Sequence, residues 1–145
     1  MADTTITAAN SIFTIMASSL FPAPVQLEGY SSDKAFATDA LELAEVNMGV
    51  DGRMTGGYVP NPVNQTIVLQ ADSPSRAIFN AIIAATKVSG DVFYLTGKLT
   101  LPSTGEKFTL TRGLLRTVKQ IPDANKVLQP VDYVITWQSV DPAPL

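Results

Sequence analysis

The sequence DGRMTGGYVPNP occupies residues 51–62, between two stretches that have the pattern of β-strands. A twelve-residue connection is long, since about two to five residues usually join neighbouring strands. Its three glycines permit positive φ angles, and its two prolines stiffen the return. Arg53, Met54 and Tyr58 belong to residue types that are enriched at protein interfaces. We therefore interpret residues 51–62 as an interaction loop; the alternative is a tolerated surface loop.

Strand patterns dominate on both sides of this loop. Apolar and β-branched residues, most of them alternating with polar ones, predict strands over residues 11–16, 25–30, 41–50, 63–71, 91–101, 107–118 and 131–140. Pro22 and Pro24 place the second of these strands after a turn or at a sheet edge. Residues 102–106 form a turn signal, which predicts an antiparallel hairpin between the strands on either side. Within 41–50 the apolar pattern slips by one residue, as it does at a β-bulge.

One helix interrupts the strands. Ser73 and Pro74 supply an N-cap and a proline at the first helical position, and Gly90 lies beyond the predicted end. The inward residues recur at helical spacing and are small or medium in size, which predicts close packing on a sheet; they are Ile78, Ala81, Ile82 and Ala85. The sum is a single mainly β domain over residues 1–145, an antiparallel sandwich or barrel with one covering helix and a long hairpin loop.

The composition excludes several kinds of chemistry. The chain has no histidine and no cysteine, which excludes His-based catalytic triads, disulfides and zinc fingers. Glu42 and Glu45 point to opposite faces of a regular strand, and the glycine-rich loop matches no phosphate-binding pattern. We therefore expect no enzymatic activity, no metal and no cofactor. Residues 1–10 lack the features of a signal peptide, and no apolar run approaches the ~18 residues of a membrane span. The expectation is a protein that folds in a cytoplasm without membrane contact.

The charges divide unevenly along the chain. Residues 1–72 carry eight acidic and two basic side chains, whereas residues 73–145 carry five acidic and eight basic ones. If the two halves face different ways, copies attract one another head to tail, a geometry that produces rings or filaments. The alternative is an even scatter of charges over the surface. Arg112, Arg116 and Lys119 form a basic stretch that is suited to charge contacts with another copy.

Residues 49–60 (GVDGRMTGGYVP) and 66–75 (TIVLQADSPS), with the helix after them, resemble tail tube proteins of contractile-tailed bacteriophages. The resemblance implies hexameric rings, stacked into a hollow tube inside a contractile sheath. It implies contacts with sheath, baseplate and tape-measure proteins, a location in the virion tail, and a lumen through which DNA passes without specific binding. The long loop would reach the neighbouring ring. The contact residues implied for it are Asp51, Gly52, Arg53, Met54, Gly56, Gly57 and Tyr58.

Two further assignments depend on this resemblance. Residues 1–20, Thr4–Leu20 in particular, would form an N-terminal arm that pairs with an adjacent copy. An acidic lumen would repel the DNA backbone, and Glu28, Glu42 and Glu45 are the candidate lumen carboxylates. Alternative functions are a baseplate tube initiator, the tube of a contractile bacteriocin or secretion machine, and a β-sandwich binding module.

Overall fold

The computed structural model describes residues 11–17, 21–27, 36–102 and 104–144. Within these residues the chain forms nine strands and one helix. The elements in chain order are β1 (Ile12–Ala17), β2 (Phe21–Gln26), β3 (Phe36–Thr38), β4 (Ala44–Met48), β5 (Met54–Tyr58), β6 (Val63–Leu69), α1 (Arg76–Ser89), β7 (Leu95–Leu101), β8 (Glu106–Val118) and β9 (Val131–Pro144).

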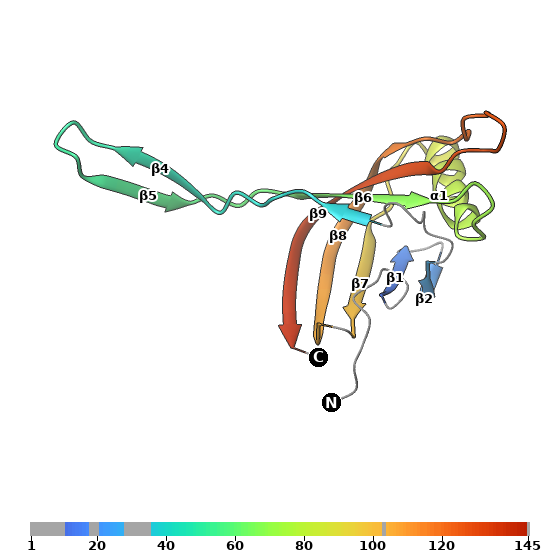
Figure 1. The fold of residues 1–145 in the computed structure, drawn as a ribbon, viewed down its shortest axis with the longest axis horizontal. Coiled ribbons are helices and arrows are strands. Elements are labelled where there is room, and N and C mark those ends of the chain that lie inside the picture. The colour runs from blue at the N-terminus through green and yellow to red at the C-terminus, as the bar shows by residue number, and fades with distance from the viewer. Residues whose placement is uncertain (1–10, 18–20, 28–35, 103, 145) are drawn as a thin grey trace.

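The body of the molecule is one curled antiparallel sheet of seven strands, in the order β2-β1-β7-β8-β9-β6-β3. Helix α1 packs on this sheet and contributes Phe79, Ile82 and Ile83 to the core. Strands β4 and β5 pair only with each other, and Figure 1 shows them projecting from the body as a long ribbon. The predicted mainly β fold with one helix is therefore confirmed, as a half-barrel with an extended hairpin.

Most predicted strands are present. The hairpin of β7 and β8 turns at Gly105, whose φ of 72° requires glycine and whose N–H donates to the Leu101 carbonyl at 3.0 Å. In β9 the predicted alternation places Val131, Tyr133, Ile135 and Trp137 in the core, each fully buried. Strand β2 starts earlier than predicted, contains both prolines and lies at the sheet edge, where proline is tolerated.

The helix is rotated relative to the prediction. It begins at Arg76, after a tight turn in which the Ser73 hydroxyl accepts the Ser75 N–H at 3.3 Å. Ile82 is buried and Ile78 packs against the core as predicted, and Ala85 is half-buried, but Ala81 is exposed, so the prediction is wrong at that position. The cause is Phe79, which stacks on Tyr133 with ring centroids 4.3 Å apart and turns the large side chains toward the sheet. Gly90 ends the helix at φ 74°, as predicted.

The curl of the sheet is built around Trp137. Its ring lies against Gly113 of β8 and Gly97 of β7, and a Cβ at Gly113 would lie 2.5 Å from its Cζ3 atom. The indole N–H donates to Oε1 of Gln65 on β6 at 2.9 Å, and both side chains are buried. Between the pairs Leu95–Gly113 and Gly97–Leu110, β8 carries one more residue than β7, a bulge that includes Arg112 and bends the strand. Arg112 has φ 46°, unusual for a non-glycine residue.

The close packing of the Trp137 ring against glycine leads to a testable prediction. Gly113→Ala places a methyl group inside the indole and should lower the free energy of unfolding by about 1–3 kcal/mol, the usual cost of overpacking. Gly57→Ala is the matched control, because a Cβ there meets nothing within 4 Å. Urea denaturation of the two variants and the parent measures the difference. Equal midpoints for all three proteins would show that the indole moves aside without cost.

Candidate assembly surface

The strands β4 and β5 with their flanking residues, 39–62, form a projecting arm. At its free end the Gly49 N–H donates to the Arg53 carbonyl at 2.8 Å, and the Gly52 N–H donates to the Gly49 carbonyl at 2.9 Å. Gly52 has φ 82°, and the Asp51 carboxylate accepts the Arg53 N–H at 3.1 Å. Glycine and aspartate at these positions are what a tight hairpin turn requires.

The arm has two chemically different faces. Directly opposite residues of an antiparallel pair share a face, and the pairs Ala44–Tyr58, Val46–Gly56 and Met48–Met54 make one face apolar. The pairs Glu45–Gly57 and Asn47–Thr55 make the other face polar.

Every residue of the two strands is exposed, and the exposed fractions of Met48 and Tyr58 reach 66% and 76%. An isolated two-stranded ribbon is only marginally stable in water, and an exposed apolar face of this kind is typical of an interaction site.

The base of the arm is tied to the body. Asn61 donates through Nδ2 to the Glu42 carbonyl at 3.0 Å, and the Val59 N–H donates to the Leu43 carbonyl at 3.2 Å. The Asp39 N–H bonds the Asn64 carbonyl of β6 at 2.9 Å, which joins the arm to the sheet. A hollow of about 210 Å³ lies at this junction, between the arm and β9. The arm is therefore anchored to the sheet at its base and is not a loose loop.

These observations correct two predictions. Residues 51–62 are not a connection without secondary structure, because Met54–Tyr58 form β5. The slip of the apolar pattern in 41–50 is not a bulge, since β4 and β5 pair without a register shift. Leu41 and Leu43 precede the strand, and Val50 lies in the turn. The sequence signal for this hairpin is the even spacing of its apolar residues on both sides of the turn. Val46 and Met48 come before the turn, and Met54 and Tyr58 come after it.

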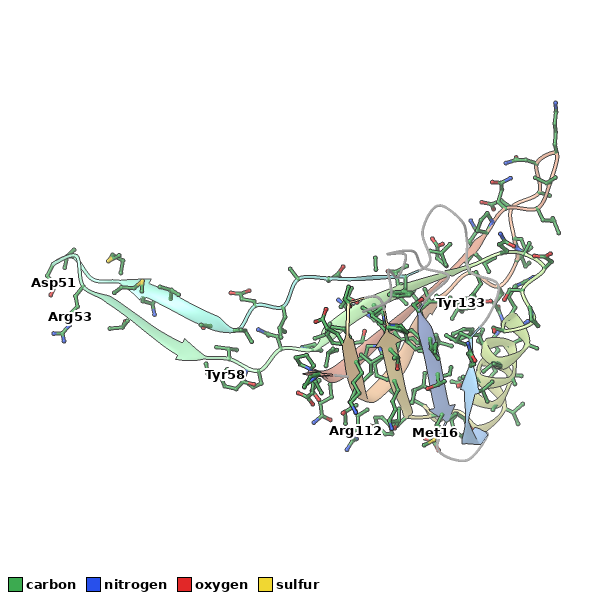
Figure 2. The ribbon with its side chains drawn as sticks, turned by 60° about the horizontal axis from the view of Figure 1, so that its bottom comes forward. Met16, Asp51, Arg53, Tyr58, Arg112 and Tyr133 are labelled. Atoms are coloured by element: carbon green, nitrogen blue, oxygen red, sulfur yellow. The ribbon has the colours of Figure 1, made fainter. Side chains whose placement is uncertain are left out.

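The predicted contact residues lie together on the arm. Figure 2 shows Asp51 and Arg53 at its free end and Tyr58 nearer the sheet. Met54 and Gly56 belong to the apolar face, Gly57 to the polar face and Gly52 to the turn. Their contact with a neighbouring copy remains a prediction.

The predicted lumen carboxylates and the predicted basic contact residues lie in different parts of the molecule. Glu45 lies on the polar face of β4 and Glu42 precedes that strand, so both belong to the arm and not to the seven-stranded sheet. Arg112 lies far from the tip of the arm (Figure 2), with its Cζ atom 4.2 Å from the ring centroid of Tyr94. Lys119 forms an ion pair with Asp123 at 2.6 Å.

The remaining predicted features are Arg116, Glu28 and the N-terminal arm. Arg116 is exposed on β8. Glu28 and most of the predicted N-terminal arm lie outside the described residues; of that arm, residues 11–17 form part of the body through β1, which pairs with β7. The lumen and charge-contact roles stay predictions.

The described residues include no group of acidic, histidine or cysteine side chains that could hold a metal ion. No helix in the described ranges is long and apolar enough to cross a membrane.

Solved structures with the same fold come from contractile injection particles. A chain of the anti-feeding prophage cap, which terminates the tube of that particle, superposes with a TM-score of 0.65 at 12% identity, covering 100% of this chain and 95% of that one. A chain of the PVC sheath/tube terminator, in the extended state, gives 0.63 at 9% identity, covering 99% of both chains. A chain of the anti-feeding prophage baseplate gives 0.60 at 10% identity, covering 99% and 98%. Comparison with curated proteins returned no significant match.

The curled antiparallel sheet, the covering helix and the projecting ribbon are thus a fold that this chain shares with chains of the anti-feeding prophage cap and the PVC sheath/tube terminator. The family model described as tail fiber protein gp32 matches residues 4–141. The chain belongs to that family.

The turn at the free end of the arm makes a second prediction. Gly52→Ala forces a side chain into the left-handed region at a cost of about 1–2 kcal/mol. Amide hydrogen exchange over residues 44–58 should therefore become about five- to thirtyfold faster, while the sheet is unaffected. Gly57→Ala, which has no positive φ and open space around it, should leave exchange unchanged. An equal effect of both substitutions would show that the turn does not hold the ribbon.

Proposed function

We propose that this protein is a structural subunit of a contractile phage-type tail, which self-assembles into stacked sixfold rings that form the inner tube. The observation that carries the proposal is the arm, an apolar ribbon face on a tube-type fold. On this proposal the arm reaches a neighbouring ring, sheath and baseplate proteins surround the tube, and DNA leaves through the lumen. The protein acts by assembly and performs no catalysis.

The energetics of the arm support self-assembly. Val46, Met48, Met54 and Tyr58 are each more than half exposed, although they share one face. Burying a large apolar side chain contributes about 1.5–3 kcal/mol, so covering this face stabilises both the ribbon and the contact. The arm thus gains order from a neighbour, whereas the body has its own core around Trp137.

A second candidate is a ring that starts or ends the tube without forming it. The solved structures with this fold include a tube-terminating cap, a sheath/tube terminator and a baseplate chain, which favours this candidate. The two candidates differ in the assembly they form alone. A tube subunit gives long hollow tubes, whereas a cap or initiator gives single or short stacks of rings.

The apolar face of the arm can be tested by a paired substitution. Met48→Asp together with Met54→Asp places two charges on the predicted contact, where burial of a charge is costly, and should abolish stacking. Asn47→Asp with Thr55→Asp is the matched control, because it adds the same charges to the opposite face.

Negative-stain electron microscopy and sedimentation velocity over a concentration series measure assembly. The parent and the control should form rings or tubes, and the methionine variant should stay small with an unchanged melting temperature, since both methionines are exposed. Equal assembly by the methionine variant and the parent would remove the apolar face from the contact.

A further inference from the structure

A second exposed apolar surface lies at the end of the molecule opposite to the arm. It is formed by the connection between β8 and β9, residues 119–130, which Figure 1 shows beside α1 and far from β4 and β5. Ile121, Val127 and Leu128 project from it with exposed fractions of 79%, 71% and 59%. We refer to residues 119–130 as the loop platform. Together with the arm it gives the chain two uncovered apolar surfaces at its two ends.

Contacts between residues of the loop platform stabilise its conformation. Lys119 pairs with Asp123, the Gln129 N–H donates to the Asp123 carbonyl at 2.8 Å, and Ala124 forms an antiparallel bridge with Leu128. These contacts hold the apolar side chains outward instead of letting them collapse onto the body. A surface that is ordered before binding loses little entropy when a partner covers it.

The helix fixes the loop platform to the body. Arg76 donates through Nη1 to the Ala71 carbonyl at 2.6 Å and through Nη2 to the Gln120 carbonyl at 3.0 Å. A hollow of about 460 Å³ lies between the platform and the turn before α1, with Val127 and Leu128 on one side and Gln70–Asp72 on the other. The end of the molecule is therefore an apolar surface with a recess, on a support that joins the sheet and the helix.

We propose that the loop platform is the acceptor for the arm of a second copy of this chain, so that copies join head to tail. The inference rests on the proposed self-assembly and adds its contact surface. The apolar face of the arm would cover Val127 and Leu128 and enter the hollow beside them. Because the two surfaces differ and lie at opposite ends, each copy can donate an arm and accept another, and the contact propagates into a ring or a stack.

The charges favour this pairing over a contact between two arms. Residues 39–62 carry four acidic side chains and one basic one, whereas residues 119–130 carry two lysines and one aspartate, which pairs with Lys119, and Asp72 lines the hollow. Lys87, near the end of α1, is bonded to Gln120 and adds a further positive charge beside the platform. Two arms face to face would bring like charges together, while an arm on the platform brings opposite charges together.

The test uses two half-blocked variants. The donor-only variant carries Val127→Asp and Leu128→Asp and keeps its arm; the acceptor-only variant carries Met48→Asp and Met54→Asp and keeps its platform. All four positions are at least 59% exposed, so both variants should fold as the parent does. Each variant alone should lose stacking, and the equimolar mixture should give a complex with equal amounts of both. Size-exclusion chromatography with light scattering, followed by mass spectrometry, measures this.

Each other outcome has a definite meaning. A donor-only variant that assembles as well as the parent would overturn the platform as acceptor and would favour contact between arms. A parent that stacks while the mixture gives no complex would also overturn the head-to-tail docking, but would leave the proposed function standing. A parent that stays monomeric throughout the concentration series would contradict both proposals.

Cross-linking provides an independent readout, because the chain contains no cysteine. Met54→Cys in one copy and Val127→Cys in another should form a disulfide between copies under mild oxidation. Val88→Cys on α1 is the control acceptor, since Val88 is 89% exposed and lies outside the platform. A yield with Val88→Cys that equals the yield with Val127→Cys would overturn the assignment.

Discussion

The indole of Trp137 lies across the strands that define the body, and the remaining structure depends on that contact. Its ring fits because Gly113 and Gly97 have no side chains, and its N–H is satisfied by Gln65 from the opposite direction. One residue of β9 therefore fixes its relation to β8, β7 and β6 at the same time. A buried donor without a partner is costly, so the hydrogen bond to Gln65 also selects the register of β6. The curl of the sheet follows, with α1 placed over it through Phe79 and Tyr133.

The body of the molecule has a hydrophobic core of its own, whereas the arm has none. The core cluster draws on β1, β6, β7, β8, β9 and α1, and neither β4 nor β5 contributes to it. The arm obtains its shape from backbone pairing and a glycine turn, and it leaves its apolar face in water. The loop platform has the same character, with apolar side chains held outward by polar contacts within the loop. Both ends of the molecule thus expose apolar side chains that do not stabilise an isolated chain, and the proposed assembly would cover them.

Several elements were predictable because local chemistry determines them. The alternation in β9, the turn at Gly105 and the end of α1 at Gly90 depend on periodicity and on positive φ angles. Other features were not predictable, because they depend on contacts between distant residues. The burial of Gln65 follows from Trp137, 72 residues away, and the rotation of α1 follows from the stack of Phe79 on Tyr133. The loop platform gave no signal in the sequence, since its exposed apolar residues resemble a short strand or core segment.

The sequence by itself determined that this protein is mainly β, has one helix and concentrates in 51–62 residue types that are common at interfaces, because strand periodicity, capping and composition are local properties. It also excluded chemistry that needs histidine or cysteine. Only the tertiary structure decided that residues 39–62 leave the sheet as a two-faced ribbon, because an apolar strand looks the same whether a core or a partner covers it. The placement of the arm and the loop platform at opposite ends likewise depends on how the sheet curls around Trp137. No pattern along the chain encodes the separation of these two surfaces.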